Sequence, residues 1–263
     1  GVELRSSAAD AVIDTPLSSY AESIRRVRAV LDQALDRRGA DASVSSDPAE
    51  GPETALSDQS TGAGRGRVVM VTSAIPGEGK TALALALART YAQAGCRVLL
   101  IDADLRKPDL HHVLGFAPSE GFLDYLREPD ATREEDGFYA DDPRSAAGVI
   151  VGRGRSDLPT DQILQSATFD ALLRRARTQM DITILDTSPL LSVVDARYVA
   201  QRVDAALFCV RFASTGQADL RQGFGQLSDS LPAGAPVISV LNRDETRGAA
   251  YRQRGYIDDP ITA

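Results

Sequence analysis

The sequence is poor in cysteine, histidine and long apolar runs, and it has no excess of basic residues. The two cysteines, Cys96 and Cys209, lie in or beside apolar runs, so we expect buried thiols rather than a disulfide or a metal site. The only histidines, His111 and His112, have no further histidine or cysteine nearby and do not make a metal-binding set. We expect them to be ordinary loop or helix residues.

No apolar run approaches the roughly 18 residues that a membrane-spanning helix needs, and no signal-peptide pattern opens the chain. A membrane segment of the full protein is therefore expected to lie outside these residues. The net charge of -8 argues against a nucleic-acid partner, because nucleic-acid binders normally carry a basic face. With 263 residues, 43% of them hydrophobic, the chain has the composition of a soluble α/β protein with one large core.

Hydrophobic periodicity divides the chain into four parts. Residues 1–37 form an N-terminal segment with a predicted helix at 16–37, capped by Ser18 or Ser19. Residues 38–66 have almost no large apolar groups and are predicted to be a flexible linker. Residues 67–247 carry the main domain, and residues 248–263 lose periodicity and are predicted to be a loose tail.

Short apolar runs alternate with helical segments in the main domain. The predicted strands are Val68–Val71, Val98–Ile101, Val149–Val151, Ile182–Leu185, Ala206–Val210 and Val237–Leu241. The predicted helices are 80–94, 161–178, 195–202 and 216–229. Because the strands are continuously apolar, we expect a doubly wound, mostly parallel sheet with helices on both faces. A polar insertion at roughly 128–146, which includes Asp141 and Asp142, is predicted to be a solvated acidic loop.

The strongest motif lies between the first predicted strand and the helix that follows it. Residues 74–81 read Ala-Ile-Pro-Gly-Glu-Gly-Lys-Thr, a Walker A phosphate loop in which Ala74 replaces the usual first glycine. Glycines let the backbone N–H groups turn toward phosphate oxygens, and the helix N-terminus adds positive charge. The fold class is therefore predicted to be that of a P-loop NTPase. The residues expected to contact the nucleotide here are Pro76, Gly77, Glu78, Gly79, Lys80, Thr81 and Ala82.

Aspartates follow two other predicted strands. Asp102 and Asp104 come after Val98–Ile101, and Asp186 follows Ile182–Leu185. The carboxyl ends of parallel strands face the crevice where open α/β sheets bind ligands. Mg²⁺ is commonly held by one or two carboxylates together with phosphate oxygens, so these side chains are candidates for a magnesium site.

The arrangement resembles the bacterial tyrosine kinase (BY-kinase) family, the cytoplasmic part of polysaccharide co-polymerases. The resemblance rests on the phosphate loop, on Asp-x-Asp-x-Arg-Lys-Pro at 102–108 and on Asp-Thr-x-Pro at 186–189. Residues 121–126 and 164–169 are also similar to family segments, as is Glu22-x-x-Arg25-x-x-Arg28 in the first helix. The resemblance to the family covers roughly residues 16–37 and 67–245.

The resemblance implies ATP and Mg²⁺ as cofactors and a catalytic set of Lys80, Asp102, Asp104 and Asp186. Lys80 and Thr81 would bind the phosphates and Mg²⁺, and Asp104 and Asp186 would help hold the metal. Asp102 would be the base that takes the tyrosine hydroxyl proton. Arg106 and Lys107 would be supporting or substrate-contacting cations, and Asn242 with Arg243 would read the adenine edge.

The same resemblance implies an assembly. Glu22, Arg25 and Arg28, which the helical spacing places on one face, would join copies of the chain into a ring. Tyr251 and Tyr256 in the tail are the candidate phosphate acceptors. The partners would be other copies and a transmembrane co-polymerase segment or activator, at the cytoplasmic, inner face of the bacterial plasma membrane.

Three departures from the family pattern keep alternatives open. Ser188 stands where the family has a proline, the tail carries only two tyrosines, and the linker is longer than usual. One alternative is a switch ATPase of the MinD/ParA kind, although Ser73–Pro76 lacks that group's signature lysine. The other is an ATP-sensing pseudokinase of a polysaccharide export complex. The expected activity remains tyrosine autophosphorylation that controls exopolysaccharide assembly.

Overall fold

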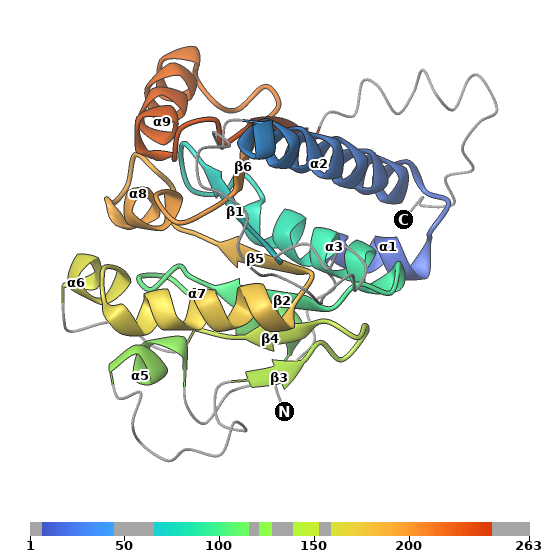
Figure 1. Ribbon diagram of the computed structural model, residues 1–263. Coiled ribbons are helices and arrows are strands. Elements are labelled where there is room, and N and C mark those ends of the chain that lie inside the picture. Colours follow the sequence, from blue (N-terminus) through green and yellow to red (C-terminus); the bar gives the residue numbers. More distant parts are fainter. Residues whose placement is uncertain (1–6, 45–65, 116–120, 128–138, 153–158, 244–263) are drawn as a thin grey trace.

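A computed structural model describes residues 7–44, 66–115, 121–127, 139–152 and 159–243, with backbone alone for 41–44. One seven-stranded sheet forms its centre, in the order β3-β4-β2-β5-β1-β6-β7. All neighbouring strands run parallel except β3 and β4. Helices cover both faces of the sheet (Figure 1). The predicted fold class is therefore confirmed.

The strands are β1 (Arg67–Ser73), β2 (Val98–Asp102), β3 (Tyr139–Asp141), β4 (Gly148–Ile150), β5 (Ile182–Asp186), β6 (Ala205–Arg211) and β7 (Val237–Asn242). The six predicted strands are all present, and β3 is an addition. Successive residues of a strand point to opposite faces. In β1, for example, Val69 and Val71 enter one core cluster while Val68 and Met70 enter the other. This two-sided burial explains why the runs are continuously apolar.

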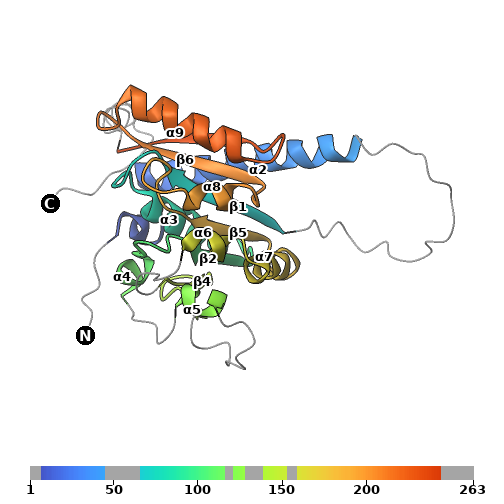
Figure 2. The ribbon, with the colours of Figure 1, turned by 90° about the vertical axis from the view of Figure 1, so that its left-hand side faces the viewer.

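Two groups of helices make the layers. The first face carries the 3-10 turn η1 (Ala8–Asp10), α1 (Ala11–Asp14), α2 (Ser19–Val44) and α3 (Lys80–Gln93). The other helices are α4 (Leu110–Leu114), α5 (Phe122–Arg127), α6 (Thr160–Leu164), α7 (Ala167–Gln179), α8 (Asp195–Ala200) and α9 (Gln217–Ser230). Among these, α5 to α9 pack on the second face, and Figure 2 shows the layers from the side.

The helix predicted at 16–37 begins later and runs further than expected. Ser18 caps α2 by accepting a hydrogen bond from the Ala21 N–H at 3.2 Å. The helix continues to Val44, so the first residues assigned to the linker are helical. One reason is long-range: the Arg38 guanidinium donates to the carbonyl of Asp204, just before β6, which holds this end of α2 on the domain. Residues 45–65 lie outside the described residues.

The helix predicted at 161–178 is interrupted and forms α6 and α7. Ser166 lies at the break in an extended conformation, and its hydroxyl accepts a hydrogen bond from the Phe169 N–H at 3.2 Å. A serine that caps a new helix favours this interruption over one continuous helix. The other main helices agree with their predicted positions to within about two residues at each end.

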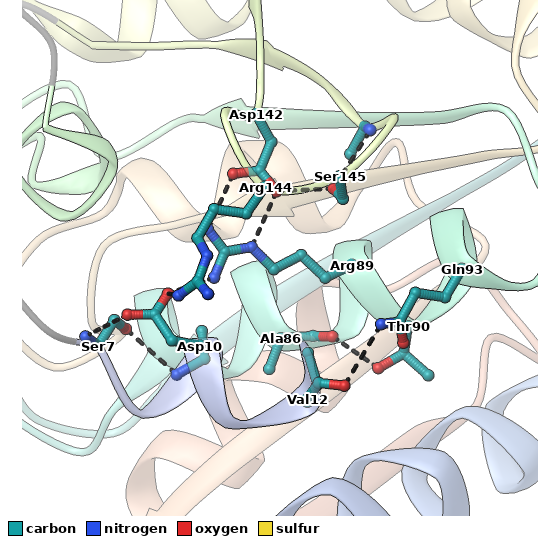
Figure 3. A network of polar contacts seen from close by, with 12 residues as sticks. Ser7, Asp10, Val12, Ala86, Arg89, Thr90, Gln93, Asp142, Arg144 and Ser145 are labelled. Carbon is teal, nitrogen blue, oxygen red and sulfur yellow. Dashed lines mark hydrogen bonds and ion pairs between the residues drawn. The ribbon is translucent and has the colours of Figure 1, made fainter. Parts of the chain in front are cut away.

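The prediction of a solvated acidic loop at 128–146 is wrong for Asp142. This carboxylate is buried and binds Arg89 of α3 through two hydrogen bonds of 2.8 Å. Arg89 also donates to Asp10 at 2.6 Å, which joins the N-terminal arm (Ser7–Thr15) to the same guanidinium (Figure 3). Arg144 in turn pairs with Asp10 at 3.2 Å. The acidic residue is therefore part of a buried ion-pair network that ties three distant segments together.

Candidate functional site

The phosphate loop occupies residues 74–79, between β1 and α3. Gly77 and Gly79 have φ values of 82° and 92°, a left-handed conformation that side chains with a Cβ adopt at a cost. Ala74 replaces the usual first glycine without conflict because it faces Gly223 of α9, where an added Cβ would lie 2.9 Å from Ala74 Cβ. The loop therefore has the backbone shape that a phosphate-binding turn requires.

Two carboxylates meet at the carboxyl ends of neighbouring strands. Asp102 and Asp186 are register partners at the ends of β2 and β5, and both are buried. The Oδ1 atom of each has no hydrogen-bond partner among the residues that the structure describes. A buried carboxylate oxygen without a partner is costly unless a cation or another donor completes it. The Asp186 oxygen fits a ligand of a divalent cation such as Mg²⁺, which takes carboxylate oxygens, and the Asp102 oxygen is left able to accept a hydrogen from another donor.

Burial dominates the electrostatics of this pair. It raises the pKa of Asp186 to about 6, although the charge of Lys80 and a hydrogen bond from Thr81 act in the opposite direction. Burial, together with the charge of Asp186, also raises the pKa of Asp102 well above its ordinary value. Lys80 and Thr81 at the start of α3 are thus close enough to affect the Asp186 carboxylate at the end of β5. The structure brings these four predicted residues to one place.

Asp104 is half-buried and lies beside the same group. Burial raises the pKa of this carboxyl, while the backbone N–H of Lys107 and the charge of Lys80 lower it. Its Oδ1 accepts hydrogen bonds from the N–H groups of Lys107 at 3.0 Å and Arg106 at 3.3 Å. One carboxylate oxygen therefore shapes the turn after β2, which leaves the other for a ligand.

Arg106 is engaged with two residues that the sequence did not single out. Its guanidinium pairs with Asp195 at 3.0 Å and donates to the Thr160 hydroxyl at 3.0 Å. The Thr160 hydroxyl donates to Asp195 at 2.9 Å, and Asp195 is almost fully buried at the start of α8. In the sequence, Asp195 is explained simply as a favourable negative charge in the first turn of a helix. Its contacts with Arg106 and Thr160 are therefore found only in the folded structure. It fixes the turn that carries Asp104.

Asn242 and Arg243 lie at the end of β7, beside the phosphate loop. The Asn242 Nδ2 donates to the Glu78 carbonyl at 2.8 Å, and its Oδ1 accepts from the Arg243 N–H at 2.9 Å. The amide group is therefore held in one orientation against the loop, with one hydrogen and one lone pair left for a ligand. The Glu78 side chain contacts the start of the loop at the Ile75 N–H and also the end of β6 and the residues after it, at Arg211 and Thr215.

The three residues predicted for ring assembly have different environments. Glu22 and Arg25 pair at 2.9 Å on the surface of α2. Arg28 instead packs over the Tyr91 ring of α3 at 4.8 Å and pairs with Asp32 at 3.5 Å. Tyr251 and Tyr256 lie outside the described residues. Within the described ranges, no helix combines the length and apolarity needed to cross a membrane.

Comparisons with known proteins agree with this geometry. Residues 69–253 match the family described as CbiA: CobQ/CobB/MinD/ParA nucleotide binding domain. The succinoglycan biosynthesis transport protein ExoP of Rhizobium meliloti is 30% identical over 206 residues, which cover 78% of this chain. This chain spans only 22% of ExoP.

A shorter relative matches over most of its length. The tyrosine-protein kinase CpsD of Streptococcus pneumoniae is 31% identical over 165 residues, covering 62% of this chain and 71% of CpsD. The kinase domain of Escherichia coli tyrosine kinase ETK has the same fold, with a TM-score of 0.71, 24% identity and coverage of 96% of this chain and 82% of that one. The chain therefore belongs to the CobQ/CobB/MinD/ParA nucleotide-binding domain family and, within it, to the bacterial tyrosine kinases.

Proposed function

We propose that this chain is an ATP-dependent tyrosine autokinase that controls exopolysaccharide polymerisation and export. The observation that carries the proposal is the facing pair Asp102 and Asp186, each with an uncompleted oxygen, beside the phosphate loop. Bound Mg²⁺ would neutralise phosphate charge, and Thr81, Asp104 and Asp186 are the residues that would hold it.

The remaining residues supply positioning and proton transfer. Lys80 and the loop N–H groups bind the phosphates, and Asn242 with Arg243 contacts the adenine. The tyrosine Oη forms a bond to the γ-phosphorus while the bond from that phosphorus to the ADP oxygen breaks. Asp102 accepts the phenolic proton, since its Oδ1 has no partner among the described residues. Phosphoryl transfer depends mostly on such positioning and charge neutralisation.

We further propose that copies of the chain assemble into a ring at the inner face of the plasma membrane and phosphorylate Tyr251 and Tyr256 of their neighbours. The exposed Glu22–Arg25 pair on α2 is the proposed contact, and Arg28 supports it from the α3 side. ExoP is by its name a transport protein of succinoglycan synthesis, which supports a transmembrane polysaccharide co-polymerase segment or activator as the partner.

Incubation with Mg-ATP followed by phosphosite mass spectrometry tests the proposal. We expect phosphotyrosine in the tail of the unaltered chain, none in Lys80→Met, and loss of the tail sites in Tyr251→Phe/Tyr256→Phe. Asp102→Asn should still bind Mg-ADP but transfer no phosphate. A chain that binds ATP tightly and forms no phosphotyrosine contradicts the kinase proposal. Phosphate release would then distinguish a switch ATPase from an ATP-sensing pseudokinase.

A further inference from the structure

Glu78 lies near the end of the phosphate loop, and its side chain contacts the start of the loop as well as the segment between β6 and α9. Its Oε1 accepts a hydrogen bond from the Arg211 N–H at 3.2 Å and another from the Thr215 hydroxyl. Its Oε2 accepts from the Ile75 N–H at 2.9 Å, at the start of the loop. The residue is only 1% exposed. Three donors converge on the two oxygens, so both oxygens of the carboxyl group have hydrogen-bond partners.

The backbone carbonyl of Glu78 makes a second set of contacts. It accepts hydrogen bonds from Asn242 Nδ2 at 2.8 Å and from Cys209 Sγ at 3.1 Å. One residue thus joins the start of the loop, the ends of β6 and β7, and the residues before α9. These segments are far apart in the sequence and adjacent only in the folded sheet.

Electrostatics alone would disfavour this residue here. A carboxylate close to bound phosphates repels them, and its burial has a desolvation cost of its own. The compensating effect must therefore be geometric. The contact from Glu78 back to Ile75 closes the loop on itself, and Gly77, which otherwise has wide conformational freedom, lies inside the closed segment. A loop already fixed in its bound shape loses less entropy when it binds a ligand.

We propose that Glu78 is a positioning residue for nucleotide binding, which holds the phosphate loop in its binding shape through Thr215 and Arg211. The proposal deepens the proposed function but rests only on its nucleotide-binding part. It makes the connection between β6 and α9 a determinant of nucleotide affinity, although that connection lies outside the Walker A motif.

Titration calorimetry with Mg-ADP as the probe tests this without any phosphoryl transfer. We expect Glu78→Ala to weaken binding about tenfold, since all three contacts are lost. Glu78→Gln keeps an amide oxygen for Arg211 and Thr215 and loses the Ile75 contact, so it should restore part of the affinity, to within about threefold of the unaltered chain. Thr215→Val should weaken binding about threefold in the unaltered chain and have no further effect in Glu78→Ala.

Ser166→Ala serves as the control for stability, because it removes the cap of α7 and leaves the loop intact. This variant should unfold more easily and bind Mg-ADP with unchanged affinity. The proposal is overturned if Glu78→Ala binds equally well or more tightly, since charge repulsion would then outweigh positioning. It is also overturned if the effects of Glu78→Ala and Thr215→Val simply add. If Glu78→Ala does not fold, Glu78→Gln and Thr215→Val carry the test, and the proposal is overturned if neither variant raises the Kd for Mg-ADP.

Discussion

The ion pair between Arg89 and Asp142 gives a sharp test of how burial changes the value of a charge pair. The Arg89 and Asp142 side chains are 2% and 0% exposed, and two hydrogen bonds of 2.8 Å join them. The chain also holds a matched pair at the surface. The Arg97 Nε and Nη2 atoms both donate to the Asp181 Oδ1, with a closest distance of 2.6 Å, and these side chains are 63% and 45% exposed.

We predict that Asp142→Asn lowers the free energy of unfolding by about 3–5 kcal/mol, because it leaves the Arg89 charge buried without full compensation. Asp181→Asn should lower it by less than about 1 kcal/mol, because water replaces the lost partner at an exposed pair. The chain contains no tryptophan, so urea unfolding is best followed by far-UV circular dichroism.

A double substitution distinguishes the effect of removing the whole ion pair from the effect of leaving one buried charge without its partner. Arg89→Met/Asp142→Leu removes both charges at once and should be less destabilising than Asp142→Asn alone. Asp10 keeps its pair with Arg144 in that variant. If Asp142→Asn costs no more than Asp181→Asn, burial does not control the energetics of this network and the reasoning is refuted.

Three further predictions concern the site and the core. Burial raises the pKa of Asp186 from 3.8 in the unfolded chain to about 6 in the folded one. The protonated carboxyl therefore contributes to the free energy of unfolding below about pH 4, and this contribution is lost as the pH rises through about 6. At about 1.4 kcal/mol for each pH unit, the free energy of unfolding of Asp186→Asn in chelator should exceed that of the unaltered chain by about 2–3 kcal/mol near pH 8, and this difference should become small near pH 4. A difference that does not vary with pH contradicts this assignment of the pKa. Gly79→Ala should destabilise the ligand-free protein by about 3 kcal/mol in urea unfolding. The left-handed backbone at this position strains a residue with a Cβ, and the new Cβ would lie 2.2 Å from the Asn242 Nδ2. Gly77→Ala should cost about 1 kcal/mol, since it has the strain alone, and equal costs would exclude the clash. Leu31 is fully buried on α2, so Leu31→Ala should lower the free energy of unfolding by about 3 kcal/mol. Val30 is half-exposed on the same helix, so Val30→Ala should lower it by less than about 1 kcal/mol. Similar values for the two variants would show that α2 is not part of the core.

Local sequence patterns were sufficient to predict the centre of the fold. The strands that cross the middle of the sheet are continuously apolar because both of their faces are covered, as Val68 to Val71 illustrate. The phosphate loop is a contiguous motif with a strand before it and a helix after it. Asp102 and Asp186 were predicted to lie close together because parallel strands end at one edge of the sheet.

Features that depend on distant partners were not predictable in this way. The strand β3 is three residues long with exposed ends, so it has no apolar run to identify it. Asp142 has the same chemistry as the acidic residues before it in the sequence, and only its contact with Arg89 makes it a buried residue. Glu78 lies at a position of the motif that is expected to contact phosphate through its backbone, so the pattern gives no direction for its side chain.

The position of Arg89 has a mechanical consequence. The N-terminal arm contacts the domain through Asp10 as well as through the buried Ala9 and Val12, and the guanidinium that binds Asp10 also binds Asp142 next to the edge strand β3. We expect a tensile force applied at Ser7 to be shared between α3 and the edge of the sheet, because Arg89 is bound to Asp142 as well as to Asp10.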